Sequence, residues 1–171
     1  MNAEKPCLLH CFVKLLLAAL PVMIFFMVAE YLIHVKWLMD LYKTTPSLWR
    51  TEEDMKAVTD SGMWPLRVVL MSLSITALYY KTRKAQCANC TTECQKKCPI
   101  VHGLCFGVAL GVLMGTMMGS SYFWMPISAE LGQKWFAAGL AEGIGAGLVL
   151  GIVCKLCRSK CAANSCTMEK K

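Results

Sequence analysis

The sequence is poor in charged residues and lacks the motifs of several common enzyme families. Only 17% of its 171 residues are Asp, Glu, Lys or Arg, whereas a soluble domain usually has about a quarter. It contains no glycine-rich phosphate loop, no GxSxG and no HExxH. The motifs of phosphate-loop NTPases, α/β-hydrolases and zinc proteases are therefore missing, and we expect a protein that is not an enzyme.

One long stretch has no charge at all, since residues 100–125 contain no Asp, Glu, Lys or Arg. A membrane span needs about 20 mainly apolar residues, and the chain, which is 56% hydrophobic, has four such runs. We predict an all-α polytopic membrane protein, a single membrane domain with transmembrane helices at 15–33, 64–80, 100–125 and 135–153. The second span is short, and Arg67 within it should extend its charged end towards the interface.

Cysteine is absent from one side of this predicted topology. With four spans, both tails and segment 81–99 share a side, which carries twelve of the 18 Lys and Arg residues. Basic residues favour the cytosolic side, so we expect both termini on the cytosolic or equivalent side. Ten of the eleven cysteines lie there, and Cys105 is close to it inside the third span. Loop 34–63, on the other side, is predicted to be interfacial, with a helix between an N-cap at Thr51 and a stop at Gly62.

The cysteines are concentrated in two basic segments, 81–99 and 154–171, and both sets begin with the spacing i, i+3, i+7. They are Cys87, Cys90, Cys94 and Cys98 in the first segment and Cys154, Cys157, Cys161 and Cys166 in the second. Thiolates bind soft metals such as Cu(I) or Zn(II), and Cys-x-x-Cys is a common ligand pair. S-acylation, disulfides between the two segments in an oxidising compartment and incidental small side chains are the alternatives.

Glycine recurs at intervals of four in the third and fourth spans. The positions are Gly103, Gly107, Gly111, Gly115 and Gly119, followed by Gly139, Gly143, Gly147 and Gly151. Small residues in such rows allow membrane helices to approach closely, so we predict glycine-zipper packing of helices 3 and 4. The pattern leaves open whether these helices pack on each other or on another copy of the chain.

Glu142 lies in the middle of the fourth span, where an ionisable residue usually marks a function. Met23 and Met27 share one face of the first span with Glu30 and His34, and the third span contains Met114 and Met118. Thioethers bind Cu(I), although methionine also fills gaps in helix packing. If Glu142 serves packing alone, it needs a fixed partner, for which we name His102, Ser72 and Ser74.

These observations predict a small oligomeric membrane protein that handles or transports a soft metal ion, Cu or Zn. Its candidate metal residues are the eight cysteines of the two segments, the four methionines Met23, Met27, Met114 and Met118, and Glu142. The alternative is a non-catalytic assembly subunit of a membrane complex, with cysteines as staples or acylation sites; a thiol–disulfide oxidoreductase is a third hypothesis. Expected partners are the lipid bilayer and further copies or other membrane subunits. Topology and anionic lipid account for the basic side, so no nucleic acid is expected.

Overall fold

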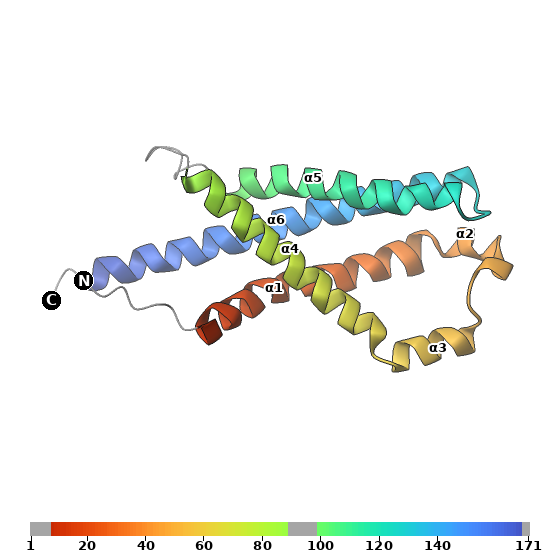
Figure 1. Ribbon diagram of the computed structural model, residues 1–171, viewed down its shortest axis with the longest axis horizontal. Coiled ribbons are helices and arrows are strands. Elements are labelled where there is room, and N and C mark those ends of the chain that lie inside the picture. Colours follow the sequence, from red (N-terminus) through yellow and green to blue (C-terminus); the bar gives the residue numbers. More distant parts are fainter. Residues whose placement is uncertain (1–7, 89–98, 169–171) are drawn as a thin grey trace.

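The structure, a computed structural model, describes residues 8–88 and 99–168 (Figure 1). All regular structure in these two ranges is helical, without a β-strand. The elements are α1 (Leu8–Glu30), η1 (Tyr31–Trp37), α2 (Met39–Lys43), η2 (Pro46–Leu48), α3 (Glu52–Asp60), α4 (Met63–Ala88), α5 (Pro99–Gly119), η4 (Ser120–Phe123) and α6 (Ala129–Met168). Of these, η1 is a π-helix, and η2 and η4 are 3-10 helices.

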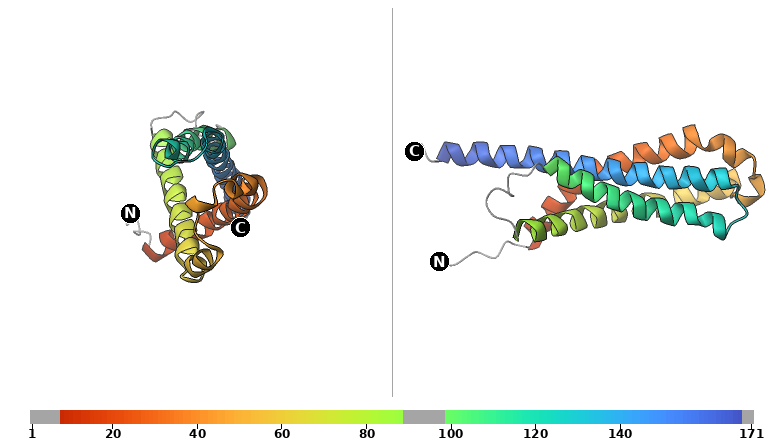
Figure 2. Two further views of the ribbon diagram at one scale, coloured as in Figure 1. Left: turned by 90° about the vertical axis from the view of Figure 1, so that its right-hand side faces the viewer. Right: turned by 90° about the horizontal axis from the view of Figure 1, so that it is seen from above.

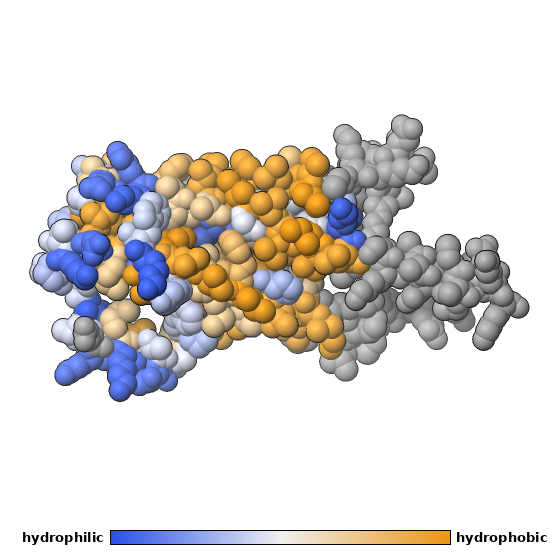
Figure 3. Space-filling model, turned by 180° about the vertical axis from the view of Figure 1, so that it is seen from behind, coloured by the Kyte–Doolittle hydropathy of each residue, from blue (hydrophilic) through white to orange (hydrophobic). Residues whose placement is uncertain are grey.

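Four helical segments are long and apolar enough to cross a membrane. They are Leu15–Trp37, Met63–Arg83, Pro99–Phe123 and Ala129–Leu156, and each overlaps one of the predicted spans. The beginnings of α1 and α5 and the ends of α4 and α6 lie towards one end of the molecule (Figure 1), as four successive crossings require. Hydrophobic side chains cover the middle of the visible face, and hydrophilic ones gather at the end with the α5–α6 connection (Figure 3). The prediction of an all-α chain with four such helices is thus confirmed.

Local sequence explains where several helices begin and end. The Thr51 side chain accepts a hydrogen bond of 3.2 Å from the backbone N–H of Asp54, which caps α3 as predicted. The chain then turns at Gly62, whose φ of +74° favours a residue without Cβ. At the start of α6, the Ser128 hydroxyl accepts from the N–H of Leu131 at 3.2 Å. These side chains satisfy backbone donors that the first helical turn leaves unpaired.

Helices α5 and α6 lie side by side and make the most extensive contacts between elements of the described chain (Figure 2). Gly107 and Gly111 of α5 are buried in this contact. A Cβ built on Gly107 would lie 2.8 Å from the carbonyl oxygen of Gly143, and one on Gly139 only 2.6 Å from the backbone nitrogen of Gly115. The two backbones therefore approach so closely that no side chain fits between them at these positions.

The other two spans pack against each other and against α6. Val22 and Phe26 of α1, Val68 and Tyr79 of α4 and Leu150 of α6 belong to one fully buried hydrophobic cluster. Helix α4 crosses α1 obliquely (Figure 1) and touches α5 and α6 only sparsely. A cavity lies between the four spans, where α4 makes only sparse contact with the α5–α6 pair.

Helix α6 is much longer than a bilayer span requires. It continues without interruption for 40 residues, from Ala129 to Met168, whereas its apolar segment ends at Leu156. Its last turns therefore project beyond the ends of the neighbouring helices (Figures 1 and 2).

Candidate functional site

A cavity of about 360 Å³ lies between the four spans. This volume is at the lower end of the range of about 300–1,000 Å³ typical of small-molecule sites. Its walls combine charged groups with thioethers and come from α1, η1, α4, α5, η4 and α6. The lining residues are Glu30, His34, Arg67, Met71, Met114, Met117, Met118, Ser121, Trp135 and Glu142.

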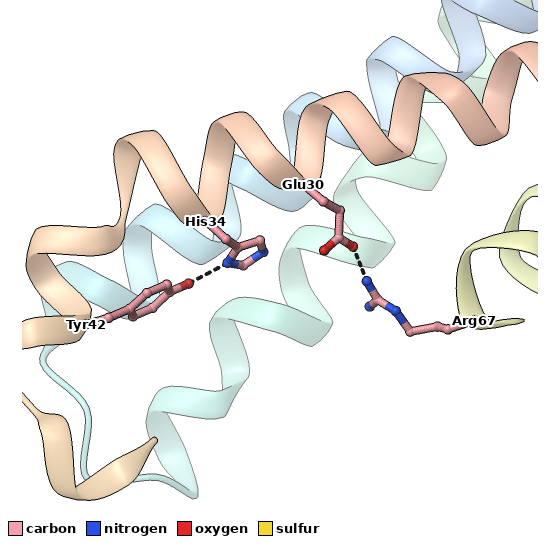
Figure 4. Close-up of polar contacts among 4 residues, drawn as sticks. All are labelled: Glu30, His34, Tyr42 and Arg67. Atoms are coloured by element: carbon pink, nitrogen blue, oxygen red, sulfur yellow. Dashed lines mark hydrogen bonds and ion pairs between the residues drawn. The ribbon is translucent and has the colours of Figure 1, made fainter. Parts of the chain in front are cut away.

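Arg67 of α4 forms an ion pair with Glu30 of α1 at the wall of this cavity (Figure 4). The Arg67 side chain is 54% exposed, while that of Glu30 is only 15% exposed. Charged groups within a span are costly unless they are paired, and here each provides the partner of the other. From the sequence, Arg67 was expected to extend towards the interface, and this pair was not predicted.

His34 belongs to η1, whose π-helical geometry appears in the 2.9 Å bond from the Leu38 N–H to the Ile33 carbonyl five residues earlier. Short π-helical segments occur frequently at functional sites. The Nδ1 atom of His34 lies 2.6 Å from the Tyr42 hydroxyl (Figure 4). The same hydroxyl accepts a 3.0 Å hydrogen bond from the indole N–H of Trp135. Tyr42 of α2 thus connects η1 to α6 at the loop end of the cavity.

The loop end also contains a small hydrophobic cluster. Leu38, Ile127 and Leu131 form its buried centre, and the Tyr42 and Trp49 rings pack beside it with centroids 4.7 Å apart. Burial raises the pKa of Tyr42 from its ordinary value of 10.0, although the hydrogen bond from Trp135 acts in the opposite direction. Through the contacts of this hydrophobic cluster, the segment between the first two spans packs on the α5–α6 connection.

Glu142 is buried, with only 3% of its surface exposed. Its Oε1 atom has no hydrogen-bond partner in the part of the chain that the structure describes. The proposed partners His102 and Ser72 do not supply one, since His102 Nε2 and Ser72 Oγ are themselves without partners among these residues. An unpaired polar atom at such depth is expensive. The carboxyl group of Glu142 therefore faces the cavity without a fixed protein partner for Oε1.

The structure brings together only part of the predicted methionine set. Met114 and Met118 line the cavity with Glu142, and Met71 and Met117, which were not predicted, line it as well. Among the described residues, the remaining two predicted methionines lie elsewhere on α1. Met23 packs against the hydrophobic cluster, and Met27 is 45% exposed.

Most of the predicted cysteine ligands lie beyond what the structure describes. Cys90, Cys94 and Cys98 are outside the described residues, and for Cys87, Cys157, Cys161 and Cys166 only the helical backbone is described. Cys154 is buried in the hydrophobic cluster, whereas Cys105 is exposed on α5. The described side chains contain no group of three or more His, Cys, Asp and Glu residues arranged to hold a metal ion. The cysteine prediction thus stays a prediction.

In comparisons with known proteins, no family model, no curated protein and no solved structure matches the chain.

Proposed function

We propose that this chain is an integral membrane protein that takes up a soft metal ion, Cu or Zn, in the cavity between its four spans and handles or transports it. The observation that carries this proposal is the position of Glu142. It is the one buried carboxylate among the described side chains, its Oε1 lacks a partner, and it lines the cavity together with Met114 and Met118. A cation is the natural ligand for a buried, unpaired carboxylate, and thioethers favour a soft one.

The cysteine segments have a separate place in this proposal. Their basic surroundings favour the cytosolic side for both, where reduced thiolates can receive or deliver the ion. The close approach of α5 and α6 forms the rigid wall that holds Met114, Met118 and Glu142 in register, and we assign it to glycine-zipper packing within one chain. Further copies of the chain would then associate through other faces.

Replacing Glu142 with glutamine tests the proposal, because Gln keeps the shape and hydrogen-bonding capacity and removes the charge. We expect E142Q to assemble in the membrane at normal levels and to lose the effect of the protein on copper or zinc accumulation in cells. Cys87→Ser combined with Cys90→Ser should have the same effect. The matched control is Glu130→Gln, an exposed acid at the surface end of α6 that pairs with Lys134 at 2.9 Å.

An unaltered copper and zinc response in E142Q and in the double cysteine variant would overturn the proposal. The assembly subunit, in which Glu142 and the cysteines have only structural roles, would then be the better description. In that case E142Q should change the abundance of the protein or of its complex, while metal content stays constant.

A further inference from the structure

The net charge of the cavity follows from the charged residues that line it. Two carboxylates, Glu30 and Glu142, and one guanidinium, Arg67, line it. The Glu30–Arg67 ion pair neutralises itself. Glu142, once ionised, is therefore the single uncompensated charge among the described lining residues, provided that His34 is neutral.

The hydrogen bond between His34 and Tyr42 is compatible with a neutral ring. The indole N–H of Trp135 can only donate, so the Tyr42 oxygen accepts from it. We assign the Tyr42 hydroxyl proton to the contact with Nδ1 of His34, 2.6 Å away, because the indole, the hydroxyl and the imidazole are then all satisfied. With this assignment the His34 proton lies on Nε2, so the ring is neutral, and Nε2 is not available as a metal ligand.

The neutral part of the lining is rich in thioethers. Met71 comes from α4, and Met114, Met117 and Met118 come from α5. Thioethers bind Cu(I) but contribute little to Zn(II), which prefers thiolate, imidazole and carboxylate ligands. A divalent ion beside Glu142 would also leave one positive charge uncompensated at a buried carboxylate, and an unpaired buried charge is unfavourable.

Resting on the proposed function, we propose that the cavity selects a singly charged soft cation, Cu(I), over Zn(II). Glu142 supplies the matching charge, and the thioethers of Met71, Met114 and Met118 supply the coordination. The Glu30–Arg67 pair determines selectivity, because it leaves the ionised form of Glu142 as the single uncompensated charge that a bound cation meets. Glu30 and Arg67 are thus positioning and charge-setting residues, and they are not ligands.

The experiment uses the full chain in detergent, with its thiols alkylated by N-ethylmaleimide so that the cysteine segments cannot bind metal. Ag(I) serves as an air-stable probe for a soft monovalent ion, and Zn(II) is the competitor; bound metal is counted by mass spectrometry after gel filtration. We expect a single silver ion per chain that excess Zn(II) does not displace. Met114→Leu combined with Met118→Leu should weaken silver binding by at least about tenfold, while Met55→Leu, an exposed methionine on α3, should not.

Charge-changing variants give the sharper test. Glu30→Gln leaves Arg67 to neutralise Glu142, so silver binding should fall by at least about tenfold. Arg67→Gln leaves two negative charges and should add Zn(II) binding. Glu30→Gln combined with Arg67→Gln restores the count and should bind silver like the unmodified chain. This double variant adds no unpaired charge to those of the unmodified chain, so it remains informative if a single variant fails to fold.

The outcomes separate the two proposals. A chain that binds Zn(II) in preference to Ag(I) after alkylation would overturn the selectivity and leave the metal function standing. Equal silver binding by Glu30→Gln and by the double variant would also overturn it. Binding of neither metal by the alkylated chain would overturn the cavity as a metal site and, with it, the proposed function.

Discussion

Replacing Gly111 with alanine should push α5 and α6 apart, because the two backbones touch at this position. A Cβ at Gly111 would lie 2.6 Å from the carbonyl oxygen of Leu140 and 3.1 Å from its Cα, whereas ordinary contact begins at 3.4 Å. Both obstructing atoms belong to the backbone and cannot rotate away. The helices would have to separate by roughly 0.8 Å, which weakens dispersion contacts along the whole interface.

Overpacked cores of other proteins give the expected loss of stability, because extra methylene groups in a tight core lower the unfolding free energy by about 1–3 kcal/mol. We expect Gly111→Ala to lie in this range, and Gly111→Leu to lie above it because the larger side chain needs a wider separation. Unfolding of the detergent-solubilised chain by a denaturing detergent, followed by circular dichroism, measures the difference in unfolding free energy. The matched control is Ala109→Leu, which adds bulk at an exposed position of α5. If Gly111→Ala is as stable as this control, the described approach of the helices is wrong.

Two further predictions concern the loop end and the topology. Tyr42→Phe removes the hydroxyl group that contacts both His34 and Trp135, and it should lower the unfolding free energy by about 1–3 kcal/mol. The control is Tyr122→Phe at an exposed position, which should change the unfolding free energy little. Equal stability of the two variants would contradict this prediction. Burial raises the pKa of Tyr42 above 10.0 in the folded state. The neutral hydroxyl group therefore stabilises the fold below pH 10, and this stabilisation is lost as pH rises through the raised pKa. In Tyr42→Phe the unfolding free energy should decline less over this alkaline range. A membrane-impermeant thiol reagent applied from the side of loop 34–63 should label no cysteine in intact membranes, and labelling of Cys90 or Cys161 from that side would reverse the orientation.

The part of the fold that depends on local composition could be predicted from the sequence. The four apolar runs each became a helix, because a long apolar segment and its backbone hydrogen bonds suffice to specify one. The capped helix after Thr51 and the turn at Gly62 followed from short-range chemistry in the same way. Glu142 was recognisable because an acid in the middle of an apolar run is costly to insert into a membrane and is rarely found there without a function.

The composition of the cavity could not be predicted, because it depends on how each helix is rotated about its own axis. Apolar residues occur on all sides of helix α1, so its sequence does not indicate which face turns inward; packing against neighbours decides that. Met27, which an α-helical period places on the side of Glu30, is exposed instead. The partner of Glu30 lies 37 residues away in the chain, and Met71 joins the site only because α4 crosses at that point.

The uninterrupted length of α6 has a consequence for distances outside the membrane. Beyond Leu156, where its apolar segment ends, the helix continues to Met168, which at about 1.5 Å per residue corresponds to roughly 18 Å. Because one helix contains both Glu142 and the backbone of Cys157, Cys161 and Cys166, the spacing between the intramembrane acid and these thiol positions is rigid. A soluble partner that approaches the last turn of α6 would therefore meet the chain at a fixed height above the lipid headgroups.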